Sequence, residues 1–205
     1  MSVPDKSSSW VIASHNPGKI RELVELFRDL SIRLRSAPEL SLAETEETGD
    51  TFEENAALKA VAAAKSSRVT AVADDSGVAV DALDGDPGVH TALWAGPERD
   101  FDIARREVNR RLAALGPDVD RHATFVTVLC VAVPDGDITF FRGEAQGRLV
   151  WPPRGDLGFG FEPMFLPDGY AITYGEMTPS HRMRVNARAQ AMRRLHAAHR
   201  HLSSE

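Results

Sequence analysis

A chain of 205 residues with 42% hydrophobic residues is long enough to bury a core, and its single cysteine excludes a disulfide within the chain. The formal net charge of −6 disfavours binding of nucleic acid over a broad basic face. No apolar run approaches the ~18 residues that span a bilayer, and the N-terminus lacks a signal-peptide pattern. We therefore expect a cytoplasmic protein with no membrane or nucleic-acid partner.

The first half of the chain alternates short apolar strands with helices. Thr51 and Glu54 form a capping box, which fixes the start of one helix well. An acidic loop over residues 44–50 precedes it. In chain order, the expected elements are a strand over residues 10–13, a helix with apolar residues at helical spacing from Ile20 to Phe27, a strand over residues 32–35, and a helix from Thr51 to about Lys65.

The second half continues the alternation and contains no repeat or linker. The expected elements are a strand over residues 69–73, a helix from Phe101 to Leu115, a hairpin of residues 123–133 and 138–141 turning at residues 134–136, and a final helix from Pro179 to about Leu202. Cys130 lies in an apolar run and is expected to be a buried, inert thiol. The pattern predicts one α/β domain over residues 1–205.

Two adjacent acids follow the apolar strand of residues 69–73. Asp74 and Asp75 precede Ser76 and Gly77, and Gly77 permits a turn. Neighbouring carboxylates raise each other's pKa unless a cation or hydrogen-bond donors compensate, so the pair indicates a metal or general-base site at a sheet edge. The alternative is an ordinary solvated turn, because Asp and Ser are common turn residues.

Two further segments have functional and ordinary interpretations. Ser14, Asn16 and Lys19 lie at the start of a helix, where backbone N–H groups and the helix dipole favour a phosphate chain; alternatively, this is a polar turn with a surface lysine. The glycine-rich loop of residues 155–163 carries Phe159 and Phe161. These rings suit stacking on a planar ligand, although core packing is the usual fate of Phe.

Six motifs occur in a fixed order between about residues 10 and 195. They are Ser14-x-Asn16-x-x-Lys19, residues 51–56 with Lys59, residues 73–77, residues 86–89, residues 158–163 and residues 173–177. Together they resemble the inosine triphosphate pyrophosphatases, which hydrolyse deaminated purine nucleoside triphosphates to monophosphate and pyrophosphate. The resemblance implies a two-lobed α/β fold with a long central mixed sheet flanked by helices, a cleft between the lobes, a requirement for Mg²⁺ and usually a homodimer.

The resemblance also implies a role for each matching residue. The triphosphate would be held by Ser14, Asn16, Lys19 and Lys59. The magnesium ion would be bound by Glu47 and Asp75, with Asp75 also activating the attacking water and Asp74 and Ser76 supporting it. The base would be contacted by Phe159, Gly160, Phe161, Glu162, Arg182, Asn186 and Arg188. Such a division suits phosphoryl chemistry, which needs cations to absorb charge and a carboxylate to orient water.

The residues expected at the base depart from the family pattern. Glu162 replaces a family Asp, and Leu93 stands where Arg is common. Counting from Glu176 without a gap places the family Lys at Arg182 and the family Ser-His-Arg at residues 186–188, so that Ala187 replaces the family His; alternatively, a local deletion makes residues 180–182 the equivalent string. The base preference is therefore open between ITP, dITP or XTP and a modified or pyrimidine nucleotide. A catalytically weak nucleotide-binding protein is the alternative function.

Overall fold

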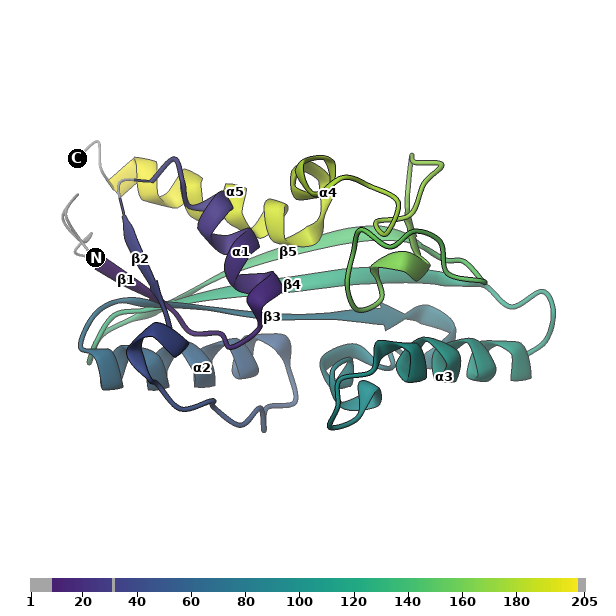
Figure 1. Cartoon of the computed structure of the whole chain (residues 1–205), viewed down its shortest axis with the longest axis horizontal. Helices are drawn as coiled ribbons and strands as arrows, with labels where there is room; N and C mark the ends of the chain where they lie inside the picture. The colour runs from purple at the N-terminus through teal and green to yellow at the C-terminus, as the bar shows by residue number, and fades with distance from the viewer. Residues whose placement is uncertain (1–8, 31, 203–205) are drawn as a thin grey trace. The chain divides into compact units, whose positions relative to one another are not determined.

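The structure, a computed structural model, describes residues 9–30 and 32–202. Its strands and α-helices are, in chain order, β1 Ser9–Ile12, α1 Pro17–Leu26, β2 Arg33–Ser36, α2 Phe52–Ser67, β3 Ala71–Val80, α3 Phe101–Ala114, β4 His122–Ala132, β5 Ile138–Leu149, β6 Phe165–Pro167, α4 Pro179–Val185 and α5 Ala187–Leu202 (Figure 1). None of the described helices combines the length and the apolar character needed to cross a membrane.

The strands form one mixed sheet with the order β2-β1-β3-β4-β5-β6. β1 runs parallel to both of its neighbours, with Ile12 opposite Ser36 of β2 and opposite Val72 of β3. β5 and β6 are antiparallel. The predicted α/β class and mixed sheet are confirmed. Ser14 follows the carboxyl end of β1, and Asp74 lies in the neighbouring strand β3, two residues after Val72, which is paired with Ile12.

β3 differs from the expectation of a short strand followed by a turn. The strand continues through the two acids to Val80, and it lies inside the sheet rather than at an edge. Val78 and Val80 are fully buried, so their β-branched side chains favour extension where Gly77 would have permitted a turn. Asp74 and Asp75 are 1% and 4% exposed, which excludes the solvated turn.

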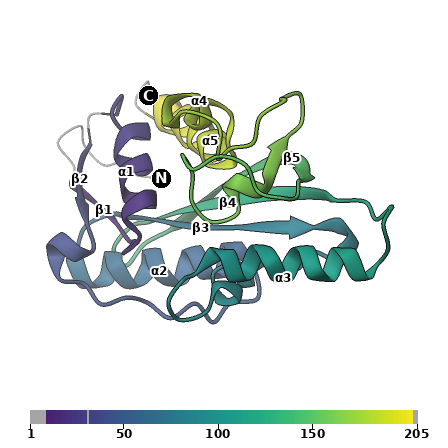
Figure 2. The same ribbon diagram turned by 45° about the vertical axis from the view of Figure 1, so that its right-hand side comes forward.

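The chain divides into two compact units by its internal contacts. Among the described residues, the first comprises residues 9–30, 32–75, 127–143 and 188–202; the second comprises Ser76–Val126 and Glu144–Ala187. In the first unit, α2 lies on one face of the strands and α1 and α5 lie on the other (Figures 1 and 2). The side chains of β3 therefore point alternately toward α2 and toward α1 with α5.

Each unit has its own apolar core. In the first unit, α1, α5 and the strands enclose Trp10, Leu23, Phe27, Val72 and Leu129. The Trp10 and Phe27 rings pack edge to face with their centroids 5.9 Å apart. On the α2 side, buried alanines allow the helix to approach the sheet closely. In this unit the thiol of Cys130 is buried, which raises its pKa to about 12 and confirms the expected inert cysteine.

The second unit buries the apolar face of α3 against the second half of β3 and the aromatic loop segments. Phe125 packs edge to face on Phe165 at 4.8 Å and on Tyr174 at 5.9 Å. Phe161 is 1% exposed and meets Phe101 edge to face. The expected helix from Phe101 to Leu115 is confirmed to within one residue.

The final helix differs from the expectation because it is interrupted. α4 ends at Val185, Asn186 has an extended backbone with ψ of 166°, and α5 starts at Ala187. Asn is favoured at the position before a helix, so Asn186 separates two helices that hydrophobic periodicity alone joins into one. The interruption falls between Arg182 and Arg188, the two basic residues expected at the base.

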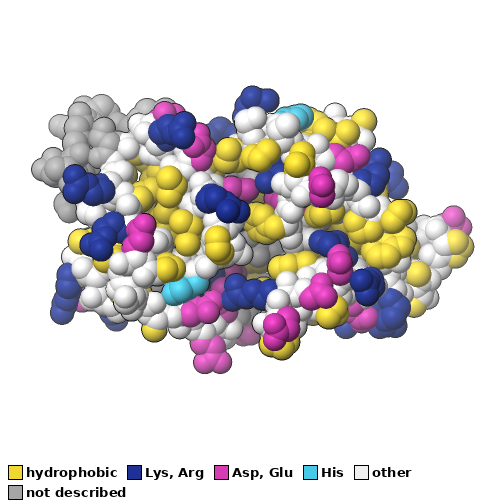
Figure 3. Space-filling view, in the orientation of Figure 1, with side chains coloured by type: hydrophobic (Ala, Val, Ile, Leu, Met, Phe, Trp, Pro, Cys, Tyr) yellow, Lys and Arg dark blue, Asp and Glu magenta, His cyan; other side chains and the backbone are white. Residues whose placement is uncertain are grey.

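The face of the molecule drawn in Figure 3 has both signs of charge interspersed with hydrophobic side chains. On this face, positive and negative side chains alternate rather than forming one broad basic patch (Figure 3).

Candidate functional site

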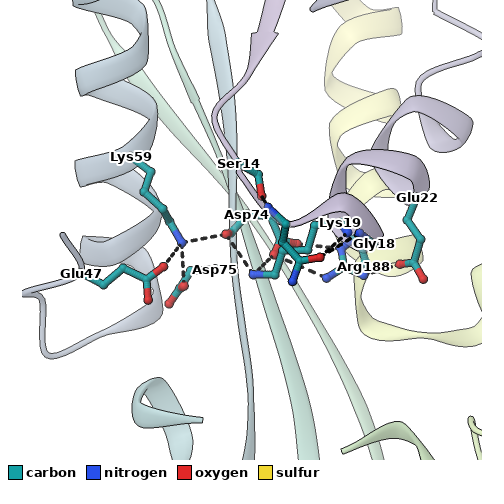
Figure 4. Close-up of polar contacts among 10 residues, drawn as sticks. Ser14, Gly18, Lys19, Glu22, Glu47, Lys59, Asp74, Asp75 and Arg188 are labelled. Atoms are coloured by element: carbon teal, nitrogen blue, oxygen red, sulfur yellow. Dashed lines mark hydrogen bonds and ion pairs between the residues drawn. The ribbon is translucent and has the colours of Figure 1, made fainter. Parts of the chain in front are cut away.

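The N-terminus of α1 is fixed by its own polar side chains. The Asn16 carboxamide oxygen accepts hydrogen bonds from the backbone N–H groups of Gly18 and Lys19 at 2.8 and 3.2 Å. The Ser14 hydroxyl accepts one from the Asn16 N–H at 3.2 Å. Asn16 thus occupies two of the backbone donors that the sequence suggested for a phosphate, and the Lys19 side chain extends from this turn to the acids of β3 (Figure 4).

Asp74 lies in a network of alternating charges. Its Oδ1 is 2.6 Å from Lys19 Nζ, and its Oδ2 accepts a hydrogen bond from Arg188 Nε at 2.8 Å. Arg188 also donates to the carboxylate of Glu22 (Figure 4). The Asp74 side chain is fully buried, and those of Arg188 and Glu22 are 6% and 9% exposed. The network joins α1, β3 and α5, so Asp74 is already neutralised within the protein.

Asp75 points to the opposite side of β3, where Lys59 of α2 is its ion-pair partner. Lys59 Nζ donates to Asp75 Oδ1 at 2.8 Å, to Glu47 Oε1 at 2.6 Å and to the backbone oxygen of Asp74 at 2.9 Å. The second carboxylate oxygen of Asp75, Oδ2, is buried and has no hydrogen-bond partner among the residues that the structure describes. An unpaired buried acceptor costs ~1–3 kcal/mol, so this oxygen is poised for a ligand.

These surroundings shift the pKa values of the Asp74 and Asp75 carboxyl groups in opposite directions. Burial alone would raise the pKa of the Asp74 carboxyl, but Arg188 and Lys19 outweigh burial and hold that pKa below its usual range. Burial raises the pKa of Asp75, and Lys59 and Lys19 only partly offset it. Burial would lower the pKa of Lys59, yet Asp75 and Glu47 raise it overall, so Lys59 stays charged.

Glu47 and Asp75 fit a magnesium ion only if the substrate completes the coordination. Within residues 9–30 and 32–202, no three His, Cys, Asp or Glu side chains gather as a metal site. Mg²⁺ commonly uses one or two protein carboxylates together with waters and substrate phosphates. The unpartnered Asp75 Oδ2 and the nearby Glu47 carboxylate supply such a donor set.

The glycine-rich loop is held within the second unit by a buried ion pair. Arg182 Nε lies 3.1 Å from Glu162 Oε1, and both side chains are at most 7% exposed. The Glu162 carboxylate accepts a hydrogen bond from the Phe159 N–H at 2.7 Å, and Arg182 Nη1 donates to the Leu157 carbonyl at 3.0 Å. The loop's shape therefore depends on Glu162 and Arg182 together.

The two aromatic side chains of this loop have different surroundings. Phe159 is half-buried, whereas Phe161 belongs to the apolar core of the second unit. Gly160 lies between them with φ of +63°, a conformation that favours glycine, and its carbonyl accepts a hydrogen bond from Arg105. Phe159 is thus the more accessible of the two rings.

The residues expected at the base do not all lie together. Arg182 is at the glycine-rich loop, whereas Arg188 is committed to Asp74 and Glu22 in the first unit. Asn186 is buried between the two helices. In the alternative string, Ser180 is exposed and the His181 ring contacts the Tyr170 ring at 5.5 Å.

Two supporting residues were missed by the sequence analysis. Glu22 is buried against Arg188, and its position three residues after Lys19 places both on one face of α1, which was the available signal. Gly49 donates its N–H to Asn55 Oδ1 at 2.8 Å. A Cβ at Gly49 would lie 2.6 Å from Glu54 Cβ, so the loop bearing Glu47 rests directly on the first turn of α2.

The fold and the site define an α/β protein whose lysines gather on a buried acid pair, an arrangement typical of proteins that handle phosphorylated ligands. The model of the Ham1 family matches residues 10–198, and the chain belongs to that family.

Relatives and solved structures agree with this membership. The chain is 54% identical over 174 residues to a dITP/XTP pyrophosphatase of Brucella melitensis, covering 82% of this chain and 79% of that protein. It is 51% identical over 185 residues to one of Rhodospirillum centenum, covering 90% and 91%. A HAM1 protein structure from Coxiella burnetii superposes with a TM-score of 0.86 at 34% identity, covering 96% of this chain and 99% of that one.

Proposed function

We propose that this protein hydrolyses nucleoside triphosphates to nucleoside monophosphates and pyrophosphate, with deaminated purine nucleotides such as dITP and XTP as its substrates. The relatives named above carry this activity in their names. The observation that carries the proposal is Asp75, a buried carboxylate with one oxygen on Lys59 and the other without a partner among the described residues.

The triphosphate would bind where Lys19 and Lys59 converge on the acids. Both ammonium groups lie within 3.4 Å of the Asp74 backbone oxygen, so they define one positive position beside β3. Ser14 lies at the same turn as Lys19 and adds a hydroxyl donor. Two lysines would offset part of the substrate's charge in a chain whose net charge is negative.

Asp75 would act as the general base. The water oxygen forms a bond to the α-phosphorus, the bond from that phosphorus to the bridging oxygen breaks, and the electron pair leaves with pyrophosphate. The proton of the water passes to the Asp75 carboxylate, whose raised pKa suits it to accept a proton better than an ordinary surface Asp. Asp74, already paired with Lys19 and Arg188, would hold its neighbours in place rather than accept the proton.

A magnesium ion held by Glu47 and Asp75 would neutralise charge on the phosphates when bound. The base would contact Phe159 and the loop that Glu162 and Arg182 hold. Glu162 and Arg182 form a buried ion pair, and Glu162 also accepts the Phe159 N–H, so the half-buried Phe159 ring is the group that this loop would offer to a base.

The test is pyrophosphate release from a panel of ordinary, deaminated and modified nucleoside triphosphates, with Mg²⁺ and with chelator. In ¹⁸O-labelled water the label should enter the monophosphate, because attack is at the α-phosphorus. Label in pyrophosphate would contradict the proposed attack. Nucleotide binding without turnover of any panel member would instead favour the alternative of a catalytically weak binding protein.

We also propose that the protein is a cytoplasmic homodimer, since the family resemblance implies a dimer. Light scattering coupled to size-exclusion chromatography measures the mass directly, and a mass near the 22.4 kDa of one chain would contradict the dimer.

A further inference from the structure

On the α2 side of the site, Lys59 connects the two carboxylates to the backbone of β3. An ammonium group has three N–H donors, and Lys59 directs them to Glu47 Oε1, Asp75 Oδ1 and the Asp74 backbone oxygen at 2.6, 2.8 and 2.9 Å. Its side chain is only 11% exposed. In this arrangement all of its donors are used, so none is directed to a phosphate.

The same two carboxylates are the proposed ligands of the divalent cation. Glu47 and Asp75 each give one oxygen to Lys59, and Asp75 Oδ2 is buried with no partner in the described part of the chain. A divalent cation on these carboxylates would share both of them with an ammonium group that lies less than 3 Å from one oxygen of each. Two cations so close repel strongly in a site with little water.

We propose that Lys59 is an exchangeable internal cation: it occupies the Glu47–Asp75 pair until a divalent cation replaces it, and the released ammonium then turns to the triphosphate. This inference rests on the proposed function. Lys59 is then a positioning residue as well as a phosphate ligand, because its departure sets when the carboxylates become available.

The exchange links the two ligands of the site. A divalent cation that displaces Lys59 frees its donors for phosphate, and a triphosphate that attracts Lys59 frees the carboxylates for the cation. Each ligand therefore raises the affinity for the other, and thermodynamic linkage makes the two factors equal. Lys19 does not take part in this exchange, because its carboxylate partner is Asp74 rather than Glu47 or Asp75 (Figure 4).

The test measures Mn²⁺ binding by electron paramagnetic resonance without nucleotide, in wild type and in Lys59→Gln. Removing the internal cation should tighten Mn²⁺ binding by about tenfold or more. Lys65→Gln is the matched control, since it removes the same charge from an exposed position on the same helix and should leave Mn²⁺ affinity at the wild-type value. The double variant Glu47→Gln/Lys59→Gln should not show the tighter Mn²⁺ binding expected of Lys59→Gln, because it also lacks a proposed cation ligand.

Equal or weaker Mn²⁺ binding by Lys59→Gln, or no binding by either protein, overturns the exchange. If that variant does not fold, acetylation of wild-type Lys59 decides: Mn²⁺ should accelerate acetylation of Lys59 and not that of Lys65, and an unchanged or slower rate overturns the proposal. Turnover with Mg²⁺ is measured separately. Intact Mg²⁺-dependent pyrophosphate release with unchanged Mn²⁺ affinity would overturn the exchange alone, whereas turnover insensitive to chelator would overturn the proposed metal requirement.

Discussion

Asp74 and Asp75 are neighbours in one strand, yet they face different surroundings. On the side of α1 and α5, Asp74 is bound by Lys19 and Arg188, and Arg188 is bound in turn by Glu22. On the side of α2, Asp75 has Lys59 on one oxygen and, among the described residues, no partner on the other. The alternation of a strand thus separates a carboxylate that holds the structure from one that remains available for chemistry.

The largest effect expected from this difference is on turnover. Asp75→Asn keeps the shape of the side chain but removes the general base, so kcat should fall by about 10²–10⁴-fold. The free energy of unfolding should fall by less than in Asp74→Asn, because burial already disfavours the ionised form of Asp75. Steady-state pyrophosphate release measures the change in kcat, and urea denaturation measures the change in the free energy of unfolding. Unaltered turnover would remove Asp75 from the catalytic assignment.

Asp74→Asn tests the other side of the strand. It removes one of the carboxylates paired with the buried Arg188, and removing one partner of a buried ion pair costs about 3–5 kcal/mol of unfolding free energy. Asp135→Asn is the matched control, because Asp135 pairs with Arg68 at an exposed position. That control should cost no more than about 1 kcal/mol in urea denaturation. Equal losses of unfolding free energy in the two variants would mean that the buried network stabilises the fold no more than an exposed ion pair does.

The pH dependence of stability should differ in sign between the two acids. The pKa of the Asp74 carboxyl lies below its ordinary value of 3.8, so its contribution to stability is present above that pH and is lost as the pH falls below it. Asp75 has a raised pKa, so its ionisation becomes a cost as the pH rises from 3.8 through the raised value.

Urea denaturation between about pH 3 and about pH 7 measures this difference. The stability of wild type relative to Asp74→Asn should grow as the pH rises. The stability of wild type relative to Asp75→Asn should shrink over the same range. Parallel curves for the two variants would contradict the opposite shifts.

The smallest expected effects come from the two helix caps. Thr51→Ala removes the capping box of α2, and Asn16→Ala removes the cap of α1; each should cost about 1 kcal/mol of unfolding free energy. Asn16 also orients the turn that bears Lys19, so only its variant should raise KM for the triphosphate markedly. An equal rise in KM for both variants would argue that helix stability, rather than the Lys19 turn, controls binding.

The sequence predicted local features better than those that depend on distant partners. The capping box at Thr51 and the helix from Phe101 are local, since their signals lie within one or two turns. The continuation of β3 through Gly77 was missed because burial of Val78 and Val80 comes from elements far along the chain. The interruption at Asn186 was missed because helical periodicity continues on both sides of it.

In the candidate site, too, the sequence predicted the residues of local motifs better than the pairs formed between distant segments. The motifs identified Lys19, Lys59 and the acid pair, and the structure brings these residues together. No spacing could have paired Arg188 with Asp74, which lies 114 residues away, or Arg182 with Glu162. Such pairs depend on which helix face meets which strand, and that is decided by the packing of the whole core.

Gly49 limits how the acidic loop can vary in evolution. Its backbone lies so close to the first turn of α2 that a methyl group would collide with Glu54 and Asn55. The loop that bears Glu47 therefore packs directly against α2, the helix that bears Lys59. A side chain at residue 49 forces either this loop or the first turn of α2 to shift, and the loop carries Glu47 while the helix carries Lys59.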